Sequence, residues 1–128
     1  MSPLMCLAVV IFFEARGETI DGQYAVAEVV MNRVTDQRYP DTVCDVVFEK
    51  NAFTGAKKSG LPKTNNNITV EAKNRAVEIA QEVLDGNTLG ITSTHYHEAS
   101  VEPFWVSSYD LDGKIGSHLF YTNNTLYK

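Results

Sequence analysis

The strongest constraint on the fold is an uninterrupted run of ten apolar residues, Leu4 to Phe13. Ser2 and Pro3 come just before the run, and they are a favoured N-cap residue and a favoured first helical residue. A helix that is apolar on all sides is normally buried. A membrane-spanning helix needs about 20 apolar residues, so this run is too short to be one. We therefore predict a buried core helix that ends near Gly17.

Glu14 is the first ionisable residue after the apolar run. A carboxylate is thus expected where a buried helix reaches the surface. Burial on one side raises the pKa of a carboxyl group, because the charged form loses hydration. A raised pKa suits a general acid that works near neutral pH. Glu14 is therefore a candidate catalytic acid, and the alternative is that it only begins the solvated end of the helix.

The chain has 128 residues and a formal net charge of -5. This length favours a single domain spanning residues 1–128. The negative charge argues against nucleic acid as a partner, and no stretch predicts membrane insertion, so we expect the chain to bind neither nucleic acid nor a membrane. We also expect a monomer. No basic residue precedes the first apolar run, so we expect no signal peptide. Without export, Cys6 and Cys44 are expected to be free buried thiols, and a disulfide between them is the alternative.

Hydrophobic periodicity predicts three further helices. They cover residues 23–35, residues 42–48 and a segment that begins at Thr69 and is ended by Gly86. Residues 49–68 show no period and are rich in Asn, Gly and Pro, which predicts irregular chain. Such a long loop is either a wall or lid of a binding site or a solvated insertion.

The composition changes after residue 90, where two strands are predicted. Residues 92–97 alternate in polarity, and residues 114–121 form a second strand after a turn at Asp112-Gly113. The chain is therefore expected to be an α+β protein, mostly helical, with a small C-terminal β-hairpin or sheet.

His95 and His97 are two residues apart on the first predicted strand, so they share one face and Tyr96 takes the other. We expect the histidines to line the cleft that holds Glu14 and Tyr96 to pack inward, because imidazole is the more polar group. His118 lies on the second predicted strand. Three histidines offer zinc ligands, so a zinc site is one alternative, and polar groups lining a groove are the other.

Six segments occur in an order that resembles a known family. They are EARGE at 14–18, GQYAVAEVVMNRV at 22–34, YPDTVCDVV at 39–47, THYH at 94–97, P-x-W at 103–105 and KIGSHLFY at 114–121. Together they resemble the SleB/CwlJ-like cell wall hydrolases, of the spore-cortex-lytic type. The resemblance covers nearly the whole chain.

The resemblance implies a lysozyme-like fold and cleavage of the β-1,4 bond between N-acetylmuramic acid and N-acetylglucosamine in peptidoglycan. The family's catalytic glutamate corresponds to Glu14. The resemblance also implies that the enzyme needs no metal and no cofactor. The product would be a 1,6-anhydro-muramic end if the enzyme is a lytic transglycosylase, or a reducing end if it is a muramidase. Candidate substrate-binding residues are Glu18, Phe53, Thr54, His95, His97, Trp105 and Tyr121. Glu18 is also a possible second carboxylate or a helix cap.

The chain departs from the family's Q-F-S segment, because Ala52 stands before Phe53 and Thr54. Two rival functions remain open. One is a zinc-dependent amidase or peptidase that uses His95, His97 and His118, and the other is a carbohydrate-binding module. A catalytic domain without a signal would suit a phage endolysin or another product of the bacterial cytoplasm that acts on the wall after release.

Overall fold

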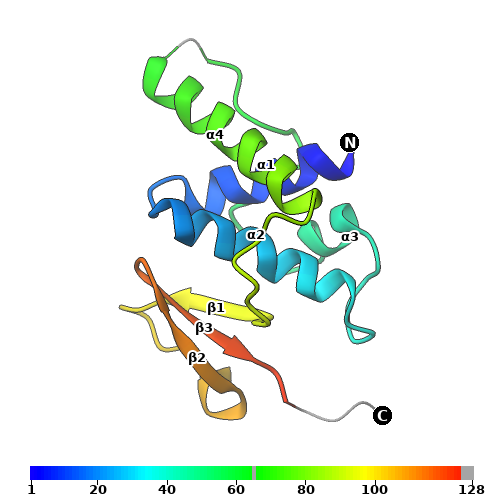
Figure 1. Ribbon diagram of the computed structural model, residues 1–128, viewed down its shortest axis with the longest axis vertical. Helices are drawn as coiled ribbons and strands as arrows, with labels where there is room; N and C mark the ends of the chain where they lie inside the picture. Colours follow the sequence, from blue (N-terminus) through cyan, green and yellow to red (C-terminus); the bar gives the residue numbers. More distant parts are fainter. Residues whose placement is uncertain (65, 125–128) are drawn as a thin grey trace.

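The computed structural model describes residues 1–64 and 66–124 as a layer of helices beside a small sheet (Figure 1). Figure 1 shows α2 between the sheet and the helices α1 and α4. The elements are α1 (Pro3–Ala15), α2 (Ile20–Val34), α3 (Val43–Val47), α4 (Asn67–Leu84), β1 (His95–Glu98), the 3-10 helix η1 (Phe104–Ser108), β2 (Asp110–Ile115) and β3 (His118–Thr122). The predicted α+β class is confirmed.

Helix α1 is the centre of the core, as its apolar run predicts. Every residue from Cys6 to Phe12 is at most 3% exposed, and α1 packs against α2, α3 and α4. Ser2 caps the helix, because its Oγ accepts a hydrogen bond from the Met5 N–H at 3.1 Å. The helix ends at Ala15, slightly before the predicted stop. Among the described residues, no helix is long and apolar enough to cross a membrane.

A disulfide joins Cys6 of α1 to Cys44 of α3, with 5.3 Å between the two Cα atoms. The expectation of two free thiols is therefore wrong. That expectation rested on the sequence before the apolar run, which carries no information about the packing of α1 against α3. The bond closes a loop of 38 residues and fixes the segment that leads into the irregular chain after α3.

The start of α4 differs from the prediction. Asn66 is the N-cap, and its Oδ1 accepts hydrogen bonds from the N–H groups of Ile68 and Thr69. The irregular segment after α3 is therefore shorter than predicted and ends at residue 66; Asn65 lies outside the described residues. The predicted end of α4 is confirmed, since Gly86 follows it with a φ of 90°.

The sheet has three antiparallel strands in the order β1-β3-β2. The second predicted strand is in fact a hairpin, because Gly116, with a φ of 60°, lies between β2 and β3. Asp112-Gly113 is not the turn but lies inside β2, where the register shifts at a bulge. A run of alternating residues does not show where the chain reverses when one glycine provides the turn.

Two side chains of α2 hold the chain segment that leads into the sheet. Glu28, which is 3% exposed, accepts hydrogen bonds from the N–H groups of residues 89, 90 and 91 at 2.8–3.2 Å. Asn32 donates to the carbonyls of Ile91 and Ser93. Buried backbone groups need such partners. These bonds fix β1 against α2 and so place the sheet relative to the end of α1.

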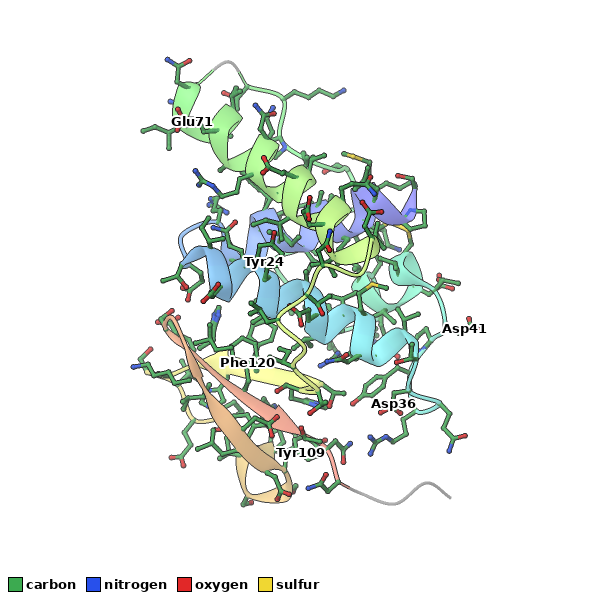
Figure 2. The ribbon with its side chains drawn as sticks, viewed as in Figure 1. Tyr24, Asp36, Asp41, Glu71, Tyr109 and Phe120 are labelled. Carbon is green, nitrogen blue, oxygen red and sulfur yellow. A yellow bond between two sulfur atoms is a disulfide. The ribbon has the colours of Figure 1, made fainter. Side chains whose placement is uncertain are left out.

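The two faces of the sheet have different surroundings. Tyr96 and Phe120 are cross-strand partners, and Phe120 lies on the face toward α2 (Figure 2). Tyr109, which follows η1, lies on the side away from the helices (Figure 2). Directly paired residues of antiparallel strands point to the same face.

Candidate active site

Glu14 lies in the last turn of α1, and two donors from distant segments hold its carboxylate. The Tyr96 hydroxyl of β1 donates to Oε1 at 3.1 Å, and the Gly55 N–H donates to Oε2 at 3.1 Å. A Cβ atom at residue 55 would overlap Oε2. Only glycine therefore lets the loop after α3 approach the carboxylate this closely.

The carboxylate also faces an open hollow of about 370 Å³. Phe13, Glu14, Arg16, Glu18, Glu98 and His118 are among the residues that line it. Glu14 itself is half-buried. A group held by fixed donors on one side and open to a ligand on the other is suitably placed for proton transfer.

Tyr96 is held in place by rings on the helix-facing side of the sheet. Its ring centroid lies 4.8 Å from that of His118, 5.6 Å from that of Phe120 and 6.4 Å from that of Phe53. Burial and the neighbouring Glu14 carboxylate raise the pKa of the Tyr96 phenol well above its usual value. Tyr96 therefore stays protonated and remains a hydrogen-bond donor to Glu14.

Glu18 shares the Glu14 hollow but is bound to the turn between β2 and β3. The N–H and the hydroxyl of Ser117 donate to its two oxygens at 2.8 and 2.6 Å. Burial alone would raise the pKa of Glu18, but these bonds and the nearby His118 lower it overall. The Nδ1 atom of His118 is buried, has no hydrogen-bond partner in the described part of the chain, and lies 3.7 Å from Glu18 Oε1.

A second hollow, of about 270 Å³, lies between the loop after α3 and β1. Arg33, His95, Tyr96 and Trp105 are among its lining residues. Tyr96 thus lines this hollow while it donates to Glu14, which lines the first one. Burial and the positive charges of Arg33 and Arg38 lower the pKa of His95 to about 4, so His95 is neutral at pH 7.

The other aromatic residues form a cluster on the face of the sheet away from the helices. The His97 ring stacks on Tyr121 at 5.3 Å, and His97 Nε2 lies 2.8 Å from the Tyr121 hydroxyl. Trp105 of η1 packs edge-on against both rings. These contacts give the small sheet a second apolar layer.

This chain is similar to known proteins along most of its length. The model of the family described as "Cell Wall Hydrolase" matches residues 17–121. The chain belongs to this cell wall hydrolase family. Spore cortex-lytic enzymes of Bacillus cereus and Oceanobacillus iheyensis are 34% and 30% identical to this chain over 91% of its length. The chain spans about two fifths of the length of these curated relatives.

Two solved structures resemble this chain. The catalytic domain of the B. cereus SleB protein has a TM-score of 0.71 at 30% identity and covers 94% of this chain and 89% of that one. The catalytic domain of the germination-specific lytic transglycosylase SleB from Bacillus anthracis has a TM-score of 0.73 at 25% identity, with 94% and 93% covered. The predicted SleB-like family and lysozyme-like fold are confirmed.

The family match begins at residue 17, so it does not include Glu14. The candidacy of Glu14 as the acid rests on its geometry here: a carboxylate with two fixed donors at the wall of a hollow. The Tyr96 and Ser117 contacts place β1 and the turn between β2 and β3 beside the end of α1.

The predicted orientation of β1 was wrong in one respect. Tyr96, rather than a histidine, reaches Glu14, while His97 and Tyr121 face away from it. Tyr96 does pack inward as predicted, but its hydroxyl extends to the acid. His95 lines the second hollow and not the Glu14 hollow.

The zinc alternative is also not supported by the geometry. His118 pairs with Glu98 and lies on the helix-facing side of the sheet, whereas His95 and His97 lie on the other face. The three imidazoles therefore cannot share one ion. Among the described residues, no group of three or more potential ligands is arranged to hold a metal.

The remaining predicted site residues lie in varied surroundings. Phe53 is only 5% exposed and belongs to the core, so its ring is not available to a sugar. Thr54 is exposed next to Gly55, and Trp105 is half-buried at the second hollow. Sequence reasoning missed Gly55, Ser117 and Arg33, whose roles depend on contacts between segments far apart in the chain.

Proposed function

We propose that this chain cleaves the β-1,4 bond between N-acetylmuramic acid and N-acetylglucosamine in peptidoglycan as a lytic transglycosylase, with Glu14 as general acid and then general base. The observation that carries the proposal is the Glu14 carboxylate, held by Tyr96 and Gly55 and open to a hollow. The similarity to a lytic transglycosylase domain over 94% of the chain supports it.

The reaction needs one carboxyl group in two protonation states. Protonated Glu14 gives its proton to the glycosidic oxygen as the bond from that oxygen to C1 of the muramic residue breaks. The resulting Glu14 carboxylate then takes the proton from the C6 hydroxyl of the same residue, whose oxygen bonds to C1. The products are a 1,6-anhydro-muramic end and a free C4 hydroxyl on the departing sugar, and Glu14 is again protonated.

Tyr96 and Gly55 have a defined part in this cycle. Both donate to the carboxylate, so they stabilise the ionised form of Glu14 that exists between the two proton transfers. They also fix the direction of the two oxygens, since one donor comes from β1 and the other from the loop after α3. Fixed orientation of a proton donor is a large contribution to catalysis.

Hydrolysis by the same acid is a second candidate, because Glu18 lies in the Glu14 hollow and its pKa is lowered. An ionised carboxylate near the acid is what a two-carboxylate glycosidase requires. However, both oxygens of Glu18 already accept hydrogen bonds from Ser117. Glu18 is therefore better placed to hold the hairpin turn than to attack C1 or to activate water.

The test is mass spectrometry of purified peptidoglycan digested by the wild-type chain and by Glu14→Gln. Glutamine fits the site if its oxygen accepts from the Gly55 N–H and its NH₂ donates to the Tyr96 hydroxyl, so the fold should persist. We expect anhydro ends from the wild type and a loss of about 10²–10⁴-fold in rate for Glu14→Gln. Reducing ends would establish hydrolysis instead, and wild-type rates for Glu14→Gln would remove Glu14 as the acid.

We also propose that the chain acts on the wall after release from the cytoplasm of a bacterial or phage-infected cell. The Cys6–Cys44 disulfide supports action in oxidising surroundings, because cytosolic thiols are kept reduced. Alkylation before and after reduction of protein recovered from lysed cultures, followed by mass spectrometry, tests this. Free thiols in the wall-associated protein would contradict it.

A further inference from the structure

Arg33 lies in the second hollow as a nearly buried cation. Its side chain comes from the last turn of α2, and the residue is 8% exposed. The guanidinium lies over the rings of Tyr39 and Phe53, with its central carbon 5.0 and 5.1 Å from their centroids. Burial lowers the pKa of this guanidinium, and Tyr39, Tyr96 and Glu49 oppose that shift. Placing a charge here therefore costs free energy.

Most of the hydrogen-bonding capacity of Arg33 is unused. A guanidinium has five N–H donors, and Arg33 Nε donates to the Thr94 carbonyl at 2.7 Å. Within residues 1–64 and 66–124, no carboxylate lies within ion-pair distance of Arg33. Arg33 lines the hollow, and its nitrogens are not among the buried, unpartnered side-chain atoms of the described residues, so its remaining donors are accessible to a ligand there.

The other walls of the hollow suit a substituted sugar. Trp105 and His95 offer flat ring surfaces, and their centroids lie 5.2 Å apart. His95 is neutral at pH 7, so it adds no charge. Lys50 and Glu49 lie at the exposed rim, which leaves Arg33 as the net positive charge of the hollow.

The hollow is connected to the acid through Tyr96, which lines it and donates to Glu14. Phe53 also packs against both Arg33 and Tyr96. A glycan bound across Tyr96 would have its scissile bond at Glu14 and a neighbouring substituent at Arg33. The overall charge of -5 gives no long-range attraction for an anion, so any preference for one must arise locally.

We propose that this hollow is an anion subsite that binds a carboxylate of the acidic peptide stem carried by muramic acid. Arg33 receives the carboxylate on its free donors, in the paired geometry that guanidinium and carboxylate groups favour. The subsite distinguishes peptide-bearing glycan from neutral glycans that have the same β-1,4 backbone. The inference rests on the proposed function, since it names the substrate feature recognised beside the acid.

The test measures binding without turnover, in the Glu14→Gln chain. One probe is the N-acetylglucosaminyl-N-acetylmuramyl disaccharide with its acidic tetrapeptide, and the other is the same molecule with every carboxyl group converted to an amide. We expect the acidic probe to bind at least about tenfold more tightly, as a charge-assisted contact predicts. We also expect it alone to shift the NMR signal of the Arg33 Nε–H group. Equal affinities, or an unmoved Arg33 signal, would overturn the proposal.

Adding Arg33→Gln to the same chain should lower the affinity for the acidic probe to that for the amide probe and leave the amide probe unaffected. Lys58→Gln removes the same charge from an exposed loop residue and should preserve the preference. If Arg33→Gln does not fold, the NMR signal of Arg33 in the parent chain still decides the question.

The subsite and the proposed function can fail separately. Anhydro ends from the wild type with equal binding of both probes would refute the subsite only. Arg33-dependent preference for the acidic probe in a chain that releases no anhydro ends would refute the transglycosylase proposal only.

Discussion

Replacing Gly55 with alanine tests whether the fit of the loop against Glu14 controls catalysis. The new Cβ atom would occupy the position of Glu14 Oε2, so either the carboxylate or the loop must move. A displacement of about 1 Å at a reacting group can lower the rate by about 100-fold. We therefore expect Gly55→Ala to lower kcat by about 100-fold.

The stability cost of Gly55→Ala can also be worked out. The displaced loop loses a hydrogen bond to a charged group, worth about 1.5–3 kcal/mol. Alanine returns about 0.4–1 kcal/mol, because it restricts the unfolded chain. The free energy of unfolding should therefore fall by about 0.5–2.6 kcal/mol, which leaves the protein folded.

Gly17→Ala is the control for the collision, since it also adds a methyl group at the wall of the Glu14 hollow but no atom lies within 4 Å of the position that its Cβ would occupy. The assay is the release of muropeptides from purified walls, with urea unfolding in parallel. In a Glu14→Ala background, Gly55→Ala should no longer destabilise, because the carboxylate that it collides with is absent. Equal kcat for the two alanine variants, or an equal stability loss in both backgrounds, would refute the reasoning.

Tyr96→Phe keeps the ring but loses the bond to the acid, so kcat in the same assay should fall about 10- to 150-fold with normal folding; an unchanged kcat would contradict this role. Reduction of the Cys6–Cys44 bond, which closes a 38-residue loop, should lower the free energy of unfolding by about 4 kcal/mol in urea titrations. The pKa of His95 is about 4 in the folded chain, compared with an ordinary value of 6.5. Between pH 4 and pH 6.5 the unfolded chain therefore binds more protons than the folded chain, so the free energy of unfolding should fall as the pH drops from 6.5 to 4. His95→Gln should flatten this decline.

The position of Glu14 could be predicted because the signal is local. An unbroken apolar run must be buried, and the first ionisable residue after it must lie where the helix leaves the core. Capping residues could be predicted in part, since Ser2 caps α1 as expected, but Asn66 rather than Thr69 caps α4. The hydrogen-bond partners of Glu14 could not be predicted from the sequence, because Gly55 and Tyr96 lie 41 and 82 residues away along the chain.

The disulfide and the hairpin were missed for different physical reasons. Whether Cys6 and Cys44 meet depends on the packing of α1 against α3, which no local pattern specifies. The strand reversal depends on the backbone of Gly116, whose φ of 60° is not visible in an alternating sequence. In the loop after α3, the family motif covers residues 52–54, whereas the residue that contacts the acid is Gly55.

The orientation of β1 shows why polarity alone was a poor guide to the site. Alternation correctly placed Tyr96 opposite His95 and His97, and the more polar residues were assigned to the cleft. Tyrosine, however, has an apolar ring and a polar tip, so it can pack in a core and still donate a hydrogen bond at the core's edge. Tyr96 does both, because its ring contacts Phe120 while its hydroxyl binds Glu14. A site at the end of a buried helix needs donors that arrive from inside the protein, and an inward-facing tyrosine can provide one where a solvent-facing histidine cannot.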